Sequence, residues 1–267
     1  LRLLVDALSE RYAGSKPDIY KAAIPARHAK AEEADTTTAW PELGEVAEPD
    51  LSAWSAYQHG ESFVDAVLAG KVANAFVAMR PPGHHAQRET PMGFCIFGNA
   101  AVGAMRALDH HGLDRVAVLD FDVHHGNGTQ RAFWDDNEVL YISLHRYENG
   151  TYYPGTTYGN YDRVGGPAAL GKSLNIPWPC GGMGDADYLH AFQRCILPVA
   201  YEFAPDMVII SAGFDAAEGD MLGGCHVSPA GYAHLTHHLA ALANGRLVVA
   251  LEGGYNLDAI ANSALAV

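Results

Sequence analysis

The chain has 267 residues, enough to bury the core of one large α/β domain or two small ones. Its formal net charge of -14 disfavours direct nucleic-acid binding and suits a basic substrate or partner. No apolar run approaches the ~20 residues that a membrane-spanning helix needs, so we expect neither nucleic acid nor membrane as a partner.

Residues 1–59 carry few structural signals. LRLLVDALSERY (1–12) fits a helix, whereas residues 34–53 are typical of an acidic, poorly structured surface segment. The chain shows no signal-peptide pattern and lacks an initiator Met, which predicts a fragment or a processed form. No second domain is recognisable. The four cysteines form no C-x-x-C pair, which argues against a cysteine zinc site or a disulfide framework.

Beyond residue 60, short β-branched runs alternate with helical patterns. The runs are apolar on both faces, as strands of a parallel sheet covered by helices require. The alternation predicts a doubly wound α/β fold. The predicted strands are NAFVAM (74–79), RVAVLDF (115–121), VLYISLH (139–145), KSLNIPW (172–178), MVIISAG (207–213) and RLVVALEGG (246–254).

The helix predicted over 99–112 carries capping signals at both ends. Asn99 is the expected N-cap, and Gly112 is the expected stop. His110 and His111 fall in the last turn, where positive charge is favourable. We expect both to be ordinary helix-end histidines.

Two later helices are also delimited by their sequence. One begins at Asp185, and Pro198 is expected to bend it. The other has Ser228 as its N-cap, Pro229 at its first position and Gly245 after its end.

Polar residues follow four of the predicted strands. RPPGHHA follows the first, DFDVHHGNG the second, AGFDAAEGD the fifth and EGGYNLD the sixth. Ligands of open α/β sheets bind beyond the carboxyl ends of the strands, so these segments should meet at one edge. The residues expected there are His84, His85, Asp120, Asp122, His124, Asp215 and Tyr255.

Asp122 and His124 lie two residues apart in an extended segment, so their side chains project to the same side. A third ligand from another strand end would give the three-ligand site with an open position that is typical of catalytic zinc. Asp215 is the best candidate, because an apolar run has no packing reason to end in a carboxylate. The alternative is that Asp122 and His124 cap helices or pair with each other. Such a donor set also accepts Fe²⁺ or Co²⁺.

His84 and His85 lie on a loop constrained by proline and glycine. Adjacent imidazoles cannot easily ligate one ion, but they can act as a paired base and acid, because partners tune each pKa separately. Asp120 and Asn127 are candidate partners, one negative and one neutral. The alternative is a pair of solvent-facing loop histidines.

Tyr255 follows two glycines at a strand end, where the backbone can approach a ligand closely. Its phenol could donate to a developing oxyanion, and a structural tyrosine is the alternative. His237 and His238 lie on a predicted helix and receive no catalytic role. His125 is expected to be a packed or hydrogen-bonded neighbour of the site.

Taken together, these motifs resemble the zinc-dependent histone deacetylases, most closely class II of the yeast and tubulin-deacetylase type. The match is dense from about Ser62 to the end and faint before it, where only IPARHAKAEE (24–33) is family-like. The resemblance implies a three-layer arginase/deacetylase-like α/β fold with a largely parallel sheet. The motifs, in family order, are RPPGHHA, GFC, DFDVHHGNGTQ, YISLHRYENGTYYPG, SAGFDAAEGD and LEGGYNLDAI.

The resemblance implies hydrolysis of the acetyl amide of N6-acetyl-lysine by an enzyme with one catalytic Zn²⁺. Asp122, His124 and Asp215 match the zinc ligands of the family. Gly126 stands where the related two-manganese arginases have Asp, so a single metal ion is implied.

His84 and His85 resemble the general acid/base pair of the family, with Asp120 and Asn127 orienting them. Asn at the second orienting position is the class II residue. Tyr255 matches the phenol that polarises the scissile carbonyl.

The tunnel for the acyl-lysine side chain is expected to involve Phe94, Tyr153, Leu222, Gly93 and Gly254. The family usually has Phe where this chain has Tyr153, which alters the expected polarity of the tunnel. Leu222 stands where the polyamine-specific relative has Glu, which favours protein acetyl-lysine over acetylated polyamines.

The resemblance also implies two structural K⁺ sites. The first is formed by Asp120, Asp122, His124, Ser143 and Leu144. The second is formed by Phe133, Asp136 and Val139.

Two departures from the family stand out. Residues 36–58 are short and unlike the corresponding family segment, and the chain ends at Val267, where relatives continue into helices. We therefore expect residues 1–267 to form a single but incomplete deacetylase catalytic domain.

The implied partners are acetylated histone tails or other acetyl-lysine proteins and a corepressor complex, in the nucleus, the cytoplasm or both. Two other functions fit the same residues. One is an acetylpolyamine or other small-amide hydrolase on this scaffold. The other is an inactive acyl-lysine-binding scaffold, which the divergent N-terminal region motivates.

Overall fold

The computed structural model describes residues 61–267. The predicted helix 1–12, the family-like stretch 24–33 and the segments 34–53 and 36–58 lie outside the described residues. All six predicted strands are confirmed. They form one parallel sheet in the order β1-β6-β5-β2-β3-β4. The strands are β1 (Asn74–Val77), β2 (Val116–Asp120), β3 (Val139–Arg146), β4 (Ser173–Trp178), β5 (Met207–Ala212) and β6 (Leu247–Leu251).

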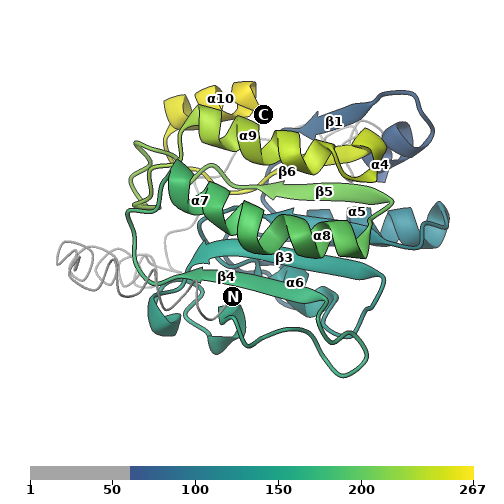
Figure 1. The fold of residues 1–267 in the computed structure, drawn as a ribbon, viewed down its shortest axis with the longest axis horizontal. Helices are drawn as coiled ribbons and strands as arrows, with labels where there is room; N and C mark the ends of the chain where they lie inside the picture. The colour runs from purple at the N-terminus through teal and green to yellow at the C-terminus, as the bar shows by residue number, and fades with distance from the viewer. Residues whose placement is uncertain (1–60) are drawn as a thin grey trace, which may run out of the picture.

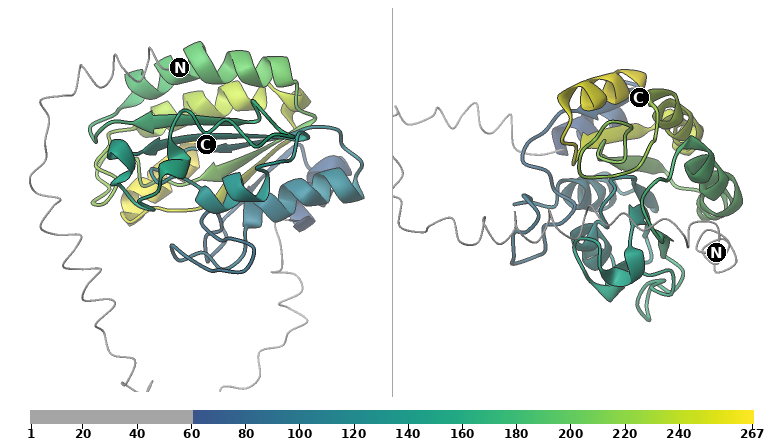
Figure 2. Two further views of the ribbon diagram at one scale, coloured as in Figure 1. Left: turned by 90° about the horizontal axis from the view of Figure 1, so that it is seen from below. Right: turned by 90° about the vertical axis from the view of Figure 1, so that its left-hand side faces the viewer.

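Helices cover both faces of the sheet, which confirms the three-layer arrangement (Figures 1 and 2). One face carries α7 (Asp185–Ala191), α8 (Leu197–Phe203) and α9 (Pro229–Ala240), with α10 (Leu257–Ala266) packed against α9. The other face carries α4 (Glu61–Leu68), α5 (Asn99–Met105) and α6 (Asn127–Ala132). Within residues 61–267, no helix is long and apolar enough to cross a bilayer.

The alternating side chains of β2 contribute to two separate apolar cores. Leu119 packs in the core beneath α7, α8 and α9, whereas Val118 packs in the core beneath α4 and α5. The central strands are therefore buried on both faces, as predicted. The prediction is wrong for β1, where Phe76 is 39% exposed, because within residues 61–267 β1 is the edge strand and pairs only with β6.

The caps predicted for the helices have mixed outcomes. Ser228 caps α9 as predicted, because its Oγ accepts the backbone N–H of Gly231. The prediction for Asn99 is wrong. Gly98 is the N-cap of α5, and the amide group of Asn99 instead donates to the backbone carbonyl of Pro81. The side chain of Asn99 is thus used to hold the loop that carries His84 and His85.

Two of the predicted helices contain π-helical turns. The turn η4 (Phe192–Ile196) joins α7 to α8 and ends just before Pro198, where the bend was predicted and where proline supplies no N–H. The turn η1 (Arg106–His110) follows α5 and ends near Gly112, whose φ of 65° fits the predicted stop.

His111 makes a contact that its sequence position did not indicate. Its Nε2 lies 2.6 Å from the Oδ1 of Asp65. The guanidinium of Arg106 donates one hydrogen bond to each carboxylate oxygen of Asp65. These bonds hold the pKa of Asp65 at about 2, because the Arg106 and His111 side chains favour the carboxylate. The contact joins α4 to the end of η1.

β2 and β5 lie side by side in the middle of the sheet, and the chain leaves them in opposite directions. β3 and β4 extend the sheet beyond β2, whereas β6 and β1 extend it beyond β5. Such a switch of direction opens a crevice at the carboxyl ends of the two strands. The register pairs Asp120 with Ser143 on one side and with Ser211 on the other. The segments that follow β2 and β5 meet at this switch point, where the N–H of Val123 donates to the Oδ1 of Asp215.

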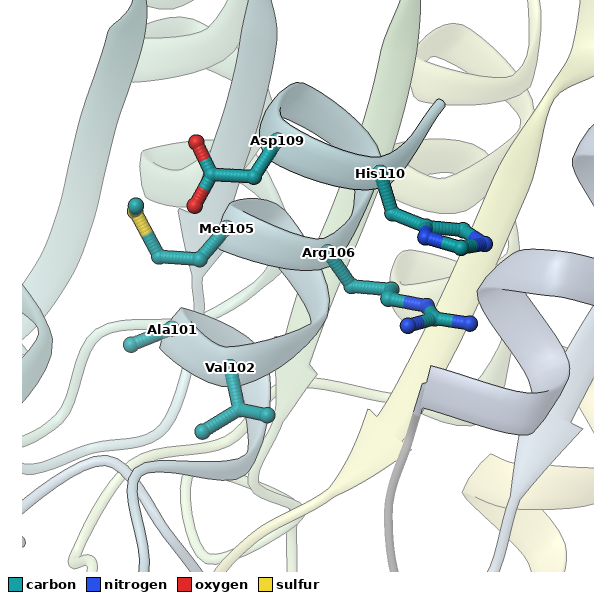
Figure 3. A pocket seen from close by; sticks show the side chains of 6 residues that line it. All are labelled: Ala101, Val102, Met105, Arg106, Asp109 and His110. Carbon is teal, nitrogen blue, oxygen red and sulfur yellow. The ribbon is translucent and has the colours of Figure 1, made fainter. Parts of the chain in front are cut away.

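A separate hollow of about 500 Å³ lies along α5 and η1 (Figure 3). Its lining side chains come from successive turns of one helical segment, and none of them belongs to the strand-end set. They are Ala101, Val102, Met105, Arg106, Asp109 and His110.

Ser228 offers a test of how the helices on the first face are fixed. Besides capping α9, its hydroxyl donates to the Oδ2 of Asp185 at 2.6 Å, which joins the starts of α7 and α9. We expect Ser228→Ala to lower the free energy of unfolding by about 1–2 kcal/mol, measured by denaturant titration. Thr156→Ala removes a longer, exposed cap bond and should change stability by less than about 0.5 kcal/mol. Equal stability of Ser228→Ala and the parent chain would contradict this account.

Candidate active site

Asp122, His124 and Asp215 converge at the carboxyl ends of β2 and β5. The Nδ1 of His124 lies 3.0 Å from the Oδ1 of Asp122 and 3.0 Å from the Oδ2 of Asp215. Atoms of all three residues that can ligate a metal lie within 4.8 Å of one another. Two carboxylates and one imidazole directed at a common point are a suitable donor set for a divalent cation.

Backbone amides hold the two carboxylates in place. Oδ2 of Asp122 accepts the N–H of Gly253 at 2.8 Å, and Oδ1 of Asp215 accepts the N–H of Val123 at 2.8 Å. A Cβ atom at Gly213 or Gly253 would collide with the carboxylate of Asp122. The glycines thus allow the ends of β5 and β6 to approach the carboxylates directly.

The buried carboxylates repel each other. Burial and the negative charge of Asp122 raise the pKa of Asp215 to about 7. Burial lowers the pKa of His124, but its hydrogen bonds to Asp122 and Asp215 outweigh burial and raise the pKa to about 9. The cluster therefore favours positive charge between the carboxylates, and a divalent cation with a neutral imidazole would supply it.

His84 and His85 lie beside this cluster, each with the partner expected from the sequence. Nδ1 of His84 lies 3.0 Å from the Oδ2 of Asp120, and Nδ1 of His85 lies 2.8 Å from the Oδ1 of Asn127. Both side chains are 3% exposed, and their ring centroids are 4.0 Å apart. Because the amide oxygen of Asn127 can only accept, it fixes a proton on the Nδ1 of His85 and leaves Nε2 as the basic nitrogen.

The environment separates the pKa values of the two histidines. Burial lowers the pKa of His84, but the carboxylates of Asp122 and Asp120 raise it well above its usual value. Burial and the positive charge of His84 lower the pKa of His85 well below its usual value. Two side chains of the same type whose pKa values are shifted in opposite directions are typical of an acid/base pair.

Tyr255 approaches the cluster from the end of β6. Its ring centroid lies 6.5 Å from that of His124, and its backbone N–H donates to the Oδ2 of Asp220 at 2.7 Å. Burial raises the pKa of Tyr255 strongly, and the charges of Asp122 and Asp215 raise it further. The phenol therefore stays protonated and can act as a hydrogen-bond donor.

Two of the residues expected to line the substrate tunnel, Tyr153 and Gly93, contact the ring of His85. The ring of Tyr153 meets the ring of His85 edge-on at 5.0 Å. Gly93 has a φ of 55°, and a Cβ atom there would collide with the ring of His85. Phe94 is 75% exposed, so it lies at the surface next to Gly93.

The other two expected tunnel residues lie on the loops that follow β5 and β6. The carbonyl of Leu222 accepts the hydroxyl of Tyr152 at 3.0 Å, and its N–H donates to Asp220 at 2.8 Å. Gly254 has a φ of 139°, and a Cβ atom there would meet the side chain of Ile260. Asp220 thus binds the backbone of both the Leu222 loop and the Tyr255 loop.

Three residues of the first expected potassium site lie in the sheet, where Asp120 pairs with Ser143 and Leu144 follows it, whereas Asp122 and His124 follow β2. Among the hydrogen bonds of residues 61–267, none is accepted by the carbonyls of Asp122 and His124. Oγ of Ser143 lies 2.8 Å from the Nδ1 of His145. At the second expected site, Phe133 and Asp136 are joined by a backbone bond of 3.2 Å, and Val139 begins β3.

His125 has the packed and hydrogen-bonded environment that was predicted. Its Nε2 lies 2.9 Å from the Oε1 of Gln130, and its ring lies 4.6 Å from that of His145. Burial lowers the pKa of His125 to about 4, so the ring is neutral. The side chain of His125 therefore lies against Gln130 and His145.

Three residues at the site were missed in the sequence. The ring of Tyr152 stacks on His124 at 5.3 Å, and the guanidinium of Arg146 lies 4.1 Å over Tyr152. Glu252 binds the loop of His84 and His85 through its carboxylate. A glutamate at the end of the apolar run LVVAL was a visible signal for Glu252, whereas nothing in YY distinguished Tyr152 from Tyr153.

Comparisons with known proteins agree with this geometry. Residues 19–267 match the model of the histone deacetylase domain. Histone deacetylase clr3 of Schizosaccharomyces pombe is 57% identical over 204 residues, covering 76% of this chain and 30% of that protein. Histone deacetylase HDA1 of Saccharomyces cerevisiae is 54% identical, covering 76% and 29%. The polyamine deacetylase HDAC10 of Homo sapiens is 50% identical, covering 76% and 30%.

Solved structures show the same fold. The crystal structure of the HDA15 HD domain has a TM-score of 0.75 at 52% identity, covering 77% of this chain and 59% of that one. The histone deacetylase Clr3 has a TM-score of 0.70 at 54% identity, covering 76% and 33%. This chain therefore spans about a third or less of the length of these three curated relatives. Its family match, its fold and its relatives together establish that the chain belongs to the histone deacetylase family, of class II type.

Proposed function

We propose that this chain hydrolyses the acetyl amide of N6-acetyl-lysine in proteins and releases acetate. The observation that carries the proposal is the meeting of three groups at one sheet edge. These are a carboxylate-rich metal-ligand set, a hydrogen-bonded histidine pair and the phenol of Tyr255. Membership of the histone deacetylase family supports the same reaction. An acyl-lysine-binding scaffold has no need of both the histidine pair and the phenol.

Zn²⁺ fits the set formed by Asp122, His124 and Asp215. The three residues offer oxygen and nitrogen ligands, backbone amides orient both carboxylates, and three protein ligands leave a position open. When bound, Zn²⁺ supplies Lewis acidity towards the acetyl oxygen and lowers the pKa of water to about 7. Fe²⁺ and Co²⁺ suit the same donors.

The residues of the chain divide the proton transfers between them. His85 accepts a proton from the attacking water at Nε2, because Asn127 holds its Nδ1–H. The hydroxyl of Tyr255 donates a hydrogen bond to the acetyl oxygen, on which negative charge develops as water attacks the carbonyl carbon. As the C–N bond breaks, a protonated histidine of the pair delivers a proton to the lysine amine. Asp120 keeps His84 oriented and charged.

Acetylated histone tails or other acetyl-lysine proteins are the proposed substrates. Relatives named as histone deacetylases support this substrate class, and Phe94, Tyr153, Gly93, Gly254 and Leu222 are the proposed tunnel residues. The acidic net charge of -14 suits a lysine-rich partner. We extend the proposal to action within a corepressor complex, in the nucleus, the cytoplasm or both.

A structural K⁺ is proposed beside the metal-ligand set. The buried carbonyl of Asp122 and the carbonyl of His124 accept no hydrogen bond within residues 61–267, which suits a cation that takes oxygen ligands. A neutral His145 accepts the hydroxyl hydrogen of Ser143, which leaves the serine oxygen to face a cation. Leu144 and Asp120 complete the proposed site. The second K⁺ site is proposed at Phe133, Asp136 and Val139, between the end of α6 and the first residue of β3.

Hydrolysis of acetylated polyamines is the second candidate function. The polyamine deacetylase HDAC10 is 50% identical over the matched region, which favours keeping this alternative. Leu222 argues against it, because an apolar side chain offers no charge to attract a polycation.

Replacement of Tyr255 tests the oxyanion role. Tyr255→Phe should lower kcat by ~10²–10³-fold, because the variant removes one hydrogen-bond donor from the transition state. Zinc content, measured by mass spectrometry, should stay equal to that of the parent chain. Near-normal turnover would rule out this role for Tyr255.

Replacement of Asp215 tests the metal set. Asp215→Asn should weaken zinc binding by at least about 10-fold in competition with a chelator, since the site loses a charged ligand. The exposed carboxylate of Glu218 provides the matched control, and Glu218→Gln should bind zinc like the parent chain. Unchanged affinity of Asp215→Asn would remove Asp215 from the proposed ligands.

Substitution at Leu222 tests the substrate class. The parent chain should show a higher kcat/KM for an acetyl-lysine peptide than for an acetylated polyamine. Leu222→Glu should shift that ratio towards the polyamine by about 10-fold or more, because a carboxylate at this position attracts a polycation. Met221→Glu adds the same charge one residue away and should shift the ratio less. A parent chain that prefers the polyamine would favour the second candidate function.

A further inference from the structure

A buried carboxylate outside the metal-ligand set binds the loop that carries the two histidines. Glu252 directly follows β6 and is 0% exposed. Its Oε2 accepts the backbone N–H of Gly83 at 2.6 Å and that of His84 at 3.0 Å. Its Oε1 accepts the hydroxyl of Ser211 at 3.1 Å. The side chain therefore links the ends of β5 and β6 to a loop far away in the sequence.

The peptide groups of His84 are held from two sides. Glu252 takes the N–H of His84, while the carbonyl of His84 accepts the N–H groups of Gly128 and Thr129 at the start of α6, at 3.0 and 3.2 Å. In addition, the guanidinium of Arg80 donates a hydrogen bond to the backbone carbonyl of Glu252 at 3.0 Å. The backbone of His84 is thus fixed between β6 and α6, and His85 is fixed with it.

The same strand end also holds a metal ligand. Glu252 binds the histidine loop, and the next residue, Gly253, donates its N–H to the Oδ2 of Asp122 at 2.8 Å. Two consecutive residues therefore bind the acid/base pair and the metal-ligand set. The end of β6 fixes how far apart these two groups lie.

Other readings of Glu252 account for less of this geometry. Potential ligand atoms of His84, Cys95 and Glu252 lie within 4.8 Å of one another, as in a metal site. However, both oxygens of Glu252 already accept hydrogen bonds, and the Sγ of Cys95 contacts the N–H of His85 at 3.4 Å. Burial raises the pKa of Glu252 to about 7, because enclosing a charged carboxylate costs free energy. The hydrogen bonds from Gly83 and His84 offset part of that cost.

We propose that Glu252 is a positioning residue, which sets His84 and His85 relative to the metal-ligand set through its acceptor oxygens. It touches neither substrate nor metal and acts only through the histidine loop. This inference rests on the proposed hydrolytic function for its kinetic test. It makes a separate claim about the backbone of the loop, which can be tested without turnover.

Two substitutions separate acceptor geometry from charge. Glu252→Gln keeps the length of the side chain and an oxygen for Gly83 and His84 but removes the charge. Glu252→Asp keeps the charge but is one methylene shorter, so it cannot reach the loop unless the loop moves. We expect kcat of the Gln variant to stay within about 5-fold of the parent, and kcat of the Asp variant to fall by ~10²-fold, with KM within about 2-fold. Both variants should keep their zinc.

Ser211→Ala is the matched control, because it removes the partner of Oε1 and leaves the loop bonds of Oε2 intact. Its kcat should stay within about 3-fold of the parent chain. If kcat of Ser211→Ala fell as far as that of Glu252→Asp, the proposal would be overturned. Activity would then depend on any hydrogen bond to the buried carboxylate, and not on its bonds to the histidine loop.

Amide hydrogen exchange of the peptide spanning residues 81–86 supplies the second readout. Exchange should be faster in Glu252→Asp than in the parent chain and unchanged in Glu252→Gln. Parent-like exchange and turnover in Glu252→Asp, or equal impairment of both variants, would overturn the proposal. If Glu252→Asp does not fold, Glu252→Gln alone tests the proposal. Slow turnover or fast amide exchange in Glu252→Gln would also overturn it. A parent chain without deacetylase activity would instead refute the proposed function, and the exchange comparison would still test the loop.

Discussion

The site depends on backbone N–H groups that hold buried carboxylates at the ends of neighbouring strands. The N–H of Val123 after β2 binds Asp215 after β5, and the N–H of Gly253 after β6 binds Asp122 after β2. Each bond crosses from one strand end to another, so the ligand set cannot form unless β2, β5 and β6 are adjacent. Desolvation of an unpaired carboxylate is costly, and these bonds offset part of that cost. The negative charge that remains is what makes the cluster of Asp122, His124 and Asp215 suited to a cation.

The order of the strands supplies this adjacency. Because the strand order reverses between β2 and β5, the segments that follow these two strands meet at one sheet edge, next to the end of β6. The histidine loop is not part of the sheet, so it needs its own attachments. Asn99, Glu252 and the start of α6 provide them. The relation between the sheet and this loop accordingly determines how His84 and His85 lie relative to Asp122, His124 and Asp215.

Much of this arrangement could be predicted from the sequence, because apolar runs and strand-end polar residues are local signals. The runs around residues 116–120 and 207–212 indicated buried parallel strands, and Asp122, His124 and Asp215 followed them at the expected edge. A prediction from the sequence was wrong where a contact with a distant residue outweighed a local capping preference. Asn99 is a good N-cap by type, but its amide binds Pro81 instead. The roles of Tyr152 and of the His111–Asp65 contact depend on residues distant in sequence, so no local pattern revealed them. The glutamate after LVVAL was visible in the sequence, but its bond to the histidine loop was not.

The central claim is that these residues act together as a zinc-dependent amide hydrolase. Release of acetate from an acetyl-lysine peptide, followed while the metal-stripped chain is titrated with Zn²⁺, tests this most directly. We expect no acetate without metal and an activity that rises until about one Zn²⁺ is bound per chain, as for a site with three protein ligands. Full activity in the stripped chain, or one bound Zn²⁺ without acetate release, would contradict it.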